Sequence, residues 1–172
     1  MSLLSIFVLG AFAYLLWAAA LFMMQRSMMF PGASLATSAT DRGAPQGVES
    51  VPIPFSGGTV EGWFVGTSAS APSPAIILAH GNAEIIDYGL RDALAFSDLG
   101  AAVLLVEYPG YRRSDGRPSR ESIGEVFLAA YDWLANRSDV DRGRIAGFGR
   151  SLGSGAISDL SRQRPLKALV LQ

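Results

Sequence analysis

The chain opens with its longest apolar stretch, residues 3–24, which carries no charged side chain. A helix of these 22 residues spans ~33 Å, close to the ~30 Å hydrocarbon core of a bilayer. Nearly every face of this helix is apolar, whereas a core helix buries one stripe. A cleavable signal peptide has a basic start and a shorter apolar core, but the first basic residue here is Arg26 and the apolar run continues past the small residues 18–20. We therefore expect residues 1–26 to form a retained, single-pass membrane helix.

Arg26 also bears on the side of the membrane that the rest of the chain occupies. By the positive-inside rule, a basic residue on this flank favours a cytoplasmic position for the part that follows. With one charge to count, the side stays open. The segment 27–46 is rich in small residues and proline, which predicts a tether. Residues 47–172 would then form the folded domain.

Strand patterns follow the tether. Residues 48–55 and 59–65 alternate in polarity on either side of Gly57 and Gly58, which predicts a β-hairpin. Two prolines within residues 72–74 are expected to break the chain. Continuous apolar runs then indicate strands that are buried on both faces of a parallel sheet. The predicted strands are 75–79, 101–106, a shorter one at 144–148, and 167–172.

Apolar side chains at helical spacing separate these strands. The predicted helices are 83–99, 119–136 and 152–160. Gly100 is placed to cap the first of them at its C-terminus. Ser119 is an N-cap candidate for the second helix, whereas Ser122 and Glu125 have capping-box spacing and would start it later.

The alternation of strands and helices predicts an α/β fold in which a mostly parallel sheet is covered by helices on both faces. The last predicted strand is apolar and would expose an unpaired edge. We therefore expect the sequence to be the N-terminal portion of a longer domain, truncated after about the sixth strand. Residues 30–172 alone are expected to aggregate.

Charge and cysteine content narrow the classes of partner. Lys and Arg total 14 and Asp and Glu total 15, so no basic field favours nucleic acid. The chain has no cysteine, which excludes disulfides, thiolate metal sites and a cysteine nucleophile.

The clearest chemical motif is G-x-S-x-G at residues 149–153, between a predicted strand and a predicted helix. A nucleophilic serine projects from a sharp strand-to-helix turn, and flanking glycines permit the close backbone approach that this turn needs. The motif predicts Ser151 as the nucleophile, with Gly149 and Gly153 in support. The N–H of Leu152 would be one oxyanion donor.

Two other interpretations of these glycines are weaker. One is a turn that only packs a helix tightly onto a sheet. The other is phosphate binding, but Gly147, Gly149 and Gly153 do not complete G-x-G-x-x-G because Leu152 occupies the decisive position. A Walker A sequence is also absent.

The sequence H-G-N at residues 80–82 follows the strand 75–79, where G-x-S-x-G hydrolases place a second oxyanion donor. In that arrangement Gly81 supports the loop and the N–H of Asn82 faces the substrate carbonyl oxygen. His80 is the only histidine in the chain. We expect it to hold this loop by hydrogen bonds, because the triad base follows both the serine and the acid along such chains.

Other charged side chains near predicted element ends have simpler interpretations. We expect Asp87, Glu107 and Asp159 to be solvated or to bind loop backbone. Arg112 and Arg113 would suit an anionic substrate, but a surface or loop-binding role is favoured over that one.

Four motifs occur in a characteristic order: H-G-N-A at 80–83, E-Y-P-G-Y at 107–111, S-D-G-R-P-S at 114–119 and G-R-S-L-G-S-G at 149–155. Together with the N-terminal apolar helix, they resemble the membrane-anchored α/β-hydrolase-domain serine hydrolases. Within these, the chain is similar to the fermentation-respiration switch protein-like and lysophospholipase-like sets.

The resemblance implies an eight-stranded, mostly parallel sheet and a Ser-Asp-His triad. It carries Ser151 over as nucleophile, and the N–H groups of Leu152 and Asn82 as oxyanion donors. The family's acid and histidine follow later strands, beyond Gln172. Arg112 departs from the pattern, since a glycine usually stands at this position.

These observations favour an esterase, thioesterase or lipase-like acyl hydrolase in the complete protein. It would act on a small-molecule or lipid acyl substrate, contact the membrane through its N-terminal helix, and need neither a metal nor an organic cofactor. No nucleic-acid partner is expected. Without the later acid and base, these 172 residues are expected to be nearly inactive. A non-catalytic, membrane-tethered interaction protein and a membrane serine peptidase remain as alternatives.

Overall fold

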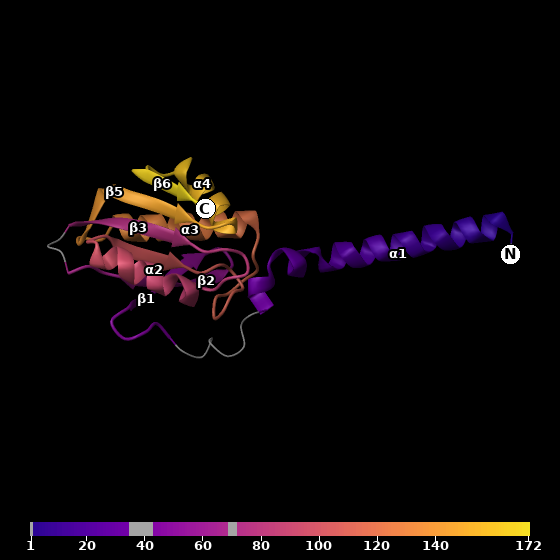
Figure 1. Cartoon of the computed structure of the whole chain (residues 1–172), viewed down its shortest axis with the longest axis horizontal. Helices are drawn as coiled ribbons and strands as arrows, with labels where there is room; N and C mark the ends of the chain where they lie inside the picture. Colours follow the sequence, from indigo (N-terminus) through magenta and orange to yellow (C-terminus); the bar gives the residue numbers. More distant parts are fainter. Residues whose placement is uncertain (1, 35–42, 69–71) are drawn as a thin grey trace.

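The structure, a computed structural model, describes residues 2–34, 43–68 and 72–172. Its centre is a six-stranded sheet in the order β1-β2-β4-β3-β5-β6 (Figure 1). The strands are β1 Glu49–Phe55, β2 Gly58–Val65, β3 Ser73–Ala79, β4 Ala102–Val106, β5 Val140–Gly149 and β6 Ala168–Leu171. The helices are α1 Leu3–Met29, α2 Ile86–Asp98, α3 Arg120–Ala135, α4 Leu152–Ser161 and the short 3₁₀ helix η1 Pro31–Ser34.

The sheet is mixed and mostly parallel, as predicted. β1 and β2 form the expected hairpin, with Phe55 opposite Gly58, and β2 pairs antiparallel with β4. β4, β3, β5 and β6 run parallel to one another, and a helix connects each of them to the next along the chain. Parallel strands end at the same edge of a sheet, so the loops after β3, β4 and β5 meet there, where α/β proteins bind ligands.

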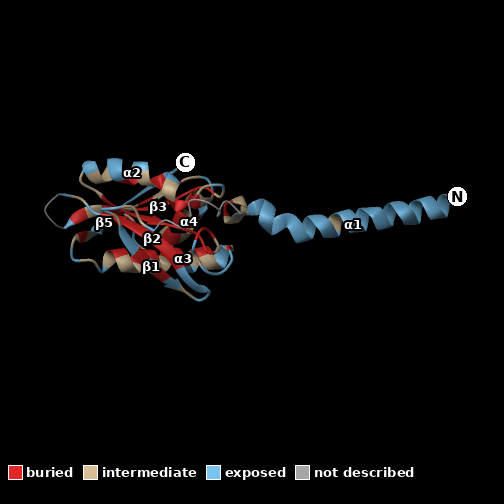
Figure 2. Cartoon of the chain, turned by 90° about the horizontal axis from the view of Figure 1, so that it is seen from below, coloured by how far each residue is buried: buried red, intermediate tan, exposed pale blue. Residues whose placement is uncertain are grey.

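Helices cover both faces of the sheet, which confirms the predicted α/β class. Figure 2 shows the buried strands between α2 on one side and α3 on the other. The buried apolar side chains of α4 lie in the same cluster as those of α3. Successive side chains of a strand point to opposite faces, so neighbouring residues of β3 enter different clusters. Ile77 lies in the cluster that includes Phe127 of α3, whereas Leu78 lies in the cluster that includes Ile86 of α2. β4 is buried along its whole length, as its continuous apolar run predicts.

The predicted break at residues 72–74 is wrong, because β3 begins at Ser73 and includes Pro74. A proline has no N–H for the ladder and is tolerated in a strand at a bulge or an edge. The pairing of β3 with β5 shifts register between Ser73 and Ala75. Pro74 therefore lies where the ladder is already interrupted.

Two predicted starting points are also wrong. β5 begins at Val140 rather than at residue 144, because residues 141–143 are two charged residues and a glycine, which give no apolar signal. α2 begins at Ile86 rather than at residue 83, because the preceding residues form a hydrogen-bonded turn.

α3 begins where Ser119 predicts. The Ser119 hydroxyl accepts the N–H of Ser122 at 3.1 Å, and the Ser119 N–H donates to the Ser122 hydroxyl oxygen at 2.9 Å. This reciprocal pair satisfies two backbone donors at the helix start. The later start from Ser122 and Glu125 is wrong, since the Glu125 carboxylate accepts the N–H of Ser56 in the hairpin turn.

α1 projects from the edge of the domain where the parallel strands end (Figure 1). None of its residues is buried. In the part of the chain that the structure describes, α1 is the one helix whose length and composition would allow it to cross a membrane. It continues to Met29, and η1 follows on the domain surface, where Phe30 and Ala33 pack against the core. Residues 35–42 of the predicted tether lie outside the described residues.

Candidate active site

Ser151 lies between β5 and α4 in a backbone conformation that residues with a side chain rarely adopt. Its φ is 51° and its ψ is −114°. Among the non-glycine residues that the structure describes, Arg112 alone shares a positive φ. Such conformations cost about 1–3 kcal/mol and persist where the surroundings hold them. The Ser151 side chain is exposed and makes no capping hydrogen bond to α4, although it lies at the positive end of that helix dipole.

Gly149 and Gly153 give this turn the room that it needs. A Cβ on Gly149 would lie 2.5 Å from the Gly153 carbonyl carbon, and a Cβ on Gly153 would overlap the Ala79 carbonyl at the end of β3. Only a hydrogen fits at either place. A turn that only packs α4 onto the sheet would explain these two glycines, but it would not explain the strained backbone of Ser151.

The loop after β3 lies beside Ser151. Ala79 is opposite Gly149 in neighbouring strands, and the Arg150 N–H donates to the Ala79 carbonyl at 3.0 Å. Within the described residues, the N–H groups of Asn82 and Leu152 have no hydrogen-bond acceptor. The two N–H groups that were predicted as oxyanion donors therefore lie at the same edge of the sheet, after β3 and after β5.

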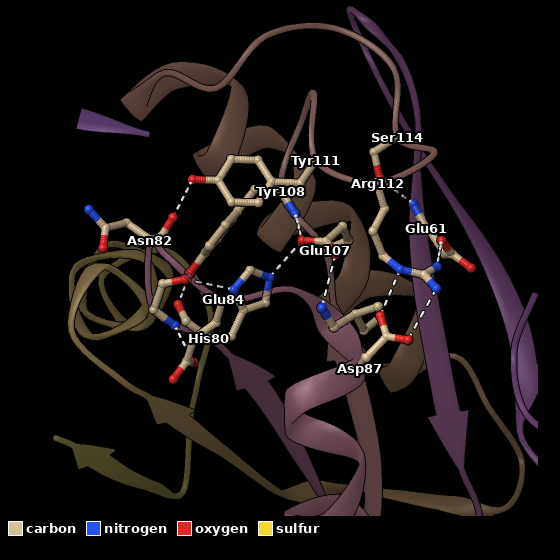
Figure 3. Close-up of polar contacts among 12 residues, drawn as sticks. Glu61, His80, Asn82, Glu84, Asp87, Glu107, Tyr108, Tyr111, Arg112 and Ser114 are labelled. Atoms are coloured by element: carbon tan, nitrogen blue, oxygen red, sulfur yellow. Dashed lines mark hydrogen bonds and ion pairs between the residues drawn. The ribbon is translucent and has the colours of Figure 1, made fainter. Parts of the chain in front are cut away.

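His80 is buried beneath this loop, with 2% of its surface exposed, and both ring nitrogens are engaged (Figure 3). Nδ1 lies 2.8 Å from the Gly81 carbonyl oxygen, which can only accept, so this nitrogen carries a hydrogen. Nε2 lies 2.7 Å from Oε1 of Glu107, whose carboxylate also accepts two backbone N–H groups. His80 therefore binds the loop and does not offer a nitrogen to Ser151.

These contacts orient the peptide between Gly81 and Asn82. The Gly81 carbonyl accepts both the His80 Nδ1–H and, at 3.1 Å, the N–H of Glu84. In a trans peptide the C=O and the following N–H point in opposite directions, so the Asn82 N–H points away from the His80 ring. The Glu84 carboxylate closes the turn by accepting the Gly81 N–H at 2.8 Å.

Arg150 connects the serine turn to this loop. Its guanidinium lies 2.9 Å from the Asp92 carboxylate and 3.3 Å from the Glu84 carboxylate. The hydrogen bond with Asp92, followed by the charge of Glu84, raises the pKa of Arg150 above its ordinary value. The sequence pattern did not identify these partners, because they lie 58 and 66 residues away along the chain.

Known proteins resemble this chain in sequence and in structure, although no family model matches it. The uncharacterized protein Rv2307c of Mycobacterium tuberculosis is 37% identical over 148 residues, which are 86% of this chain and 52% of that protein. The α/β hydrolase domain-containing protein WAV2 of Arabidopsis thaliana is 34% identical over 113 residues, 64% of this chain and 37% of that protein. The carboxylesterase EstE1, cloned from a metagenomic library, has a structure that aligns with a TM-score of 0.58 and 26% identity over 87% of this chain and 53% of its own.

The chain has the α/β-hydrolase fold. It spans about half the length of Rv2307c and a smaller share of WAV2. The chain shares this fold with the carboxylesterase EstE1.

Arg112 has a left-handed backbone, φ 47°, at the position where the family resemblance implies a glycine. Its side chain is fully buried and lies 2.7 Å from the carboxylates of both Glu61 and Asp87. The guanidinium also lies 5.1 Å from the centre of the Trp63 ring. Arg113, which is half exposed, pairs with Glu61 at 2.6 Å. Both arginines therefore bind the protein's own carboxylates. The surface or loop-binding role expected of Arg112 is wrong, because its side chain is buried between carboxylates of β2 and α2.

The remaining acidic candidates also have structural partners. Asp159 of α4 is partly exposed and pairs with Arg120 of α3 and with Arg162. Asp87 and Glu107 bind the side chains described above. Across residues 2–34, 43–68 and 72–172, no group of three or more His, Cys, Asp or Glu side chains is arranged to hold a metal ion.

The ionisation of Glu61 makes the stability of the domain depend on pH. Burial alone would raise the pKa of Glu61, but hydrogen bonds from Arg113 and Trp63 and the charge of Arg112 outweigh burial and hold this pKa below its ordinary value of 4.5. The ionised carboxylate therefore contributes stability above pH 4.5 that is lost as the pH falls through the lower, folded-state pKa. Between about pH 5 and pH 3, we expect Tm to fall more steeply for the wild type than for Glu61→Gln. Parallel Tm curves for the two proteins would contradict this role.

Proposed function

We propose that the complete protein is a membrane-anchored serine hydrolase that cleaves acyl ester or thioester bonds with Ser151 as its nucleophile. The observation that carries the proposal is the positive φ of Ser151 between Gly149 and Gly153, at the start of α4. Such a backbone costs stability, and packing α4 onto the sheet does not require it. The esterase among the structural neighbours supports the same class of reaction.

In the proposed reaction, the Ser151 oxygen attacks the acyl carbonyl carbon while its proton passes to a general base. The backbone N–H groups of Leu152 and Asn82 stabilise the oxyanion that forms on the carbonyl oxygen. The base then protonates the departing alcohol or thiol, and water releases the acyl group from Ser151. Following the family resemblance, we place the histidine base and its acid on residues after Gln172, because His80 is already engaged within the fold.

A cavity at the same edge suits the apolar part of an acyl substrate. Its volume is about 380 Å³, and most of its lining is apolar or glycine. Its wall includes Leu152, next to the proposed nucleophile, and Met29 and Phe30 at the end of α1. With α1 across a bilayer, this cavity lies near the lipid surface. We therefore propose that the acyl group comes from a lipid.

Covalent labelling tests the proposal. A fluorophosphonate reacts with an activated serine, and we expect it to label the full-length, membrane-embedded protein at Ser151. Ser151→Ala should abolish labelling. Ser161→Ala is the matched control on α4, because this hydroxyl donates to the Ser158 carbonyl within the helix, and its labelling should equal that of the wild type.

The absence of labelling in the folded wild-type protein would contradict the proposal. It would favour the membrane-tethered interaction protein, which reuses the fold without catalysis. If Ser151 is labelled, comparison of acyl esters with peptide amides as substrates distinguishes an esterase from a serine peptidase.

A further inference from the structure

We propose that the segment joining the membrane helix to the domain positions the oxyanion loop of the hydrolase. This segment, residues 29–32, is called the junction below. The inference rests on the proposed function of the Asn82 N–H. It assigns Gly32 and Tyr111 as positioning residues, which act through Asn82 and do not touch the substrate.

The junction is hydrogen-bonded to Asn82 at two places. The side-chain amide of Asn82 donates to the Met29 carbonyl at 3.0 Å, in the last turn of α1. The Gly32 N–H donates to the Asn82 backbone carbonyl, also at 3.0 Å. The Tyr111 hydroxyl donates to the same carbonyl at 2.8 Å (Figure 3). Asn82 therefore makes three hydrogen bonds through these groups, and two of them are with the chain at the end of the membrane helix.

Gly32 fits this place because it has no side chain. A Cβ here would overlap the Tyr111 ring and would lie 2.8 Å from the Asn82 carbonyl oxygen. Phe30 and Ala33, before and after Gly32, pack against the hydrophobic core. The junction therefore packs closely against the loop that contains Asn82. A larger residue at position 32 would have to displace Asn82 or Tyr111.

Tyr111 remains a hydrogen-bond donor over the whole physiological pH range. Its side chain is buried, and burial, followed by the charge of Glu107, raises the pKa of Tyr111 to about 12. Its ring meets the ring of Tyr108 edge-on, with 5.4 Å between centroids. Phenylalanine would keep this packing and would lose only the hydroxyl.

His80 positions the N–H side of Asn82, and the junction positions its carbonyl side. His80 and Glu84 fix the Gly81 carbonyl, and with it the peptide plane that contains the Asn82 N–H. The junction and Tyr111 fix the Asn82 carbonyl on the other side. An oxyanion donor is effective only when it is preorganised at ~2.7–3.1 Å from the developing charge. Loosening one end should therefore lower kcat more than it raises KM.

Gly32→Ala in the full-length protein tests the inference. We expect kcat to fall by about 10- to 100-fold, part of the ~10²–10³ that the loss of one oxyanion donor costs, with KM changed by less than about threefold. Gly10→Ala in α1 is the control substitution, because a Cβ at Gly10 meets nothing within 4 Å, and both constants should stay at wild-type values. Tyr111→Phe should lower kcat by about three- to tenfold while its Tm stays near the wild-type value.

Labelling separates failure of this inference from failure of the proposed function. If the wild type reacts with a fluorophosphonate at Ser151 while Gly32→Ala and Tyr111→Phe keep its kcat, the role of the junction is overturned and the proposed function stands. If the wild type does not react, the proposed function fails and the inference fails with it. Should Gly32→Ala not fold, kcat of the folded Tyr111→Phe protein decides.

Discussion

Ser151→Ala is expected to lower kcat/KM of the full-length protein for an acyl ester by roughly 10⁴- to 10⁶-fold. Alanine offers no oxygen to attack the carbonyl carbon. The N–H groups of Leu152 and Asn82 remain to bind the carbonyl oxygen, so KM should change little. Steady-state hydrolysis of nitrophenyl acyl esters of increasing chain length measures the effect. Activity above about a tenth of the wild-type value would show that another group is the nucleophile.

The same position allows catalysis and stability to be measured separately. Ser151→Gly removes the Cβ from a residue at φ 51° and relieves about 1–3 kcal/mol of strain, against about 0.5–1 kcal/mol of added chain entropy in the unfolded state. We therefore expect the free energy of unfolding to rise by about 1 kcal/mol in an equally inactive protein. Ser151→Ala keeps the Cβ and should unfold in urea as the wild type does. If Ser151→Gly is less stable than Ser151→Ala, the backbone of Ser151 is not strained.

Arg112→Ala is expected to lower the free energy of unfolding by about 3–5 kcal/mol. The substitution leaves the carboxylates of Glu61 and Asp87 without their buried cation and removes the guanidinium from beside Trp63. The loss is large beside the total stability of a typical domain, about 5–15 kcal/mol. Urea unfolding of the full-length protein, followed by tryptophan fluorescence, measures it.

Arg113→Ala is the matched control for Arg112→Ala. Its side chain also pairs with Glu61, but 45% of it is exposed, and exposed ion pairs contribute about 1 kcal/mol or less. Equal losses for the two substitutions would show that the burial of Arg112 does not determine its contribution.

Local signals in the sequence predicted much of the fold and the position of the serine. The hairpin at Gly58, the fully buried β4 and the start of α3 at Ser119 each depend on neighbouring residues, which a local pattern records. The sharp turn at Ser151 was predicted in the same way, because it needs Gly149 and Gly153 beside it in the chain. The register irregularity that accommodates Pro74 depends on β5 and left no local signal.

The supporting contacts of the site were beyond local patterns for the same reason. Arg112 and Glu61 are 51 residues apart, and Asn82 and Met29 are 53 apart. The left-handed backbone conformation of Arg112 accompanies ion pairs with Glu61 and Asp87, which lie far from it in the sequence. In the sequence, Gly32 is only a small residue that follows an apolar helix. The composition of residues 27–46 therefore predicted a tether at this place and not a packed junction.

With α1 inserted in a bilayer, its direct passage into the junction would hold the proposed active edge close to that bilayer. No unbonded spacer separates α1 from Asn82, since the last turn of α1 is itself hydrogen-bonded to that residue. With α1 inserted, the proposed enzyme would meet its substrates by lateral diffusion within one leaflet. Its rate would then follow the mole fraction of substrate in that leaflet, and added inert lipid would slow turnover by surface dilution.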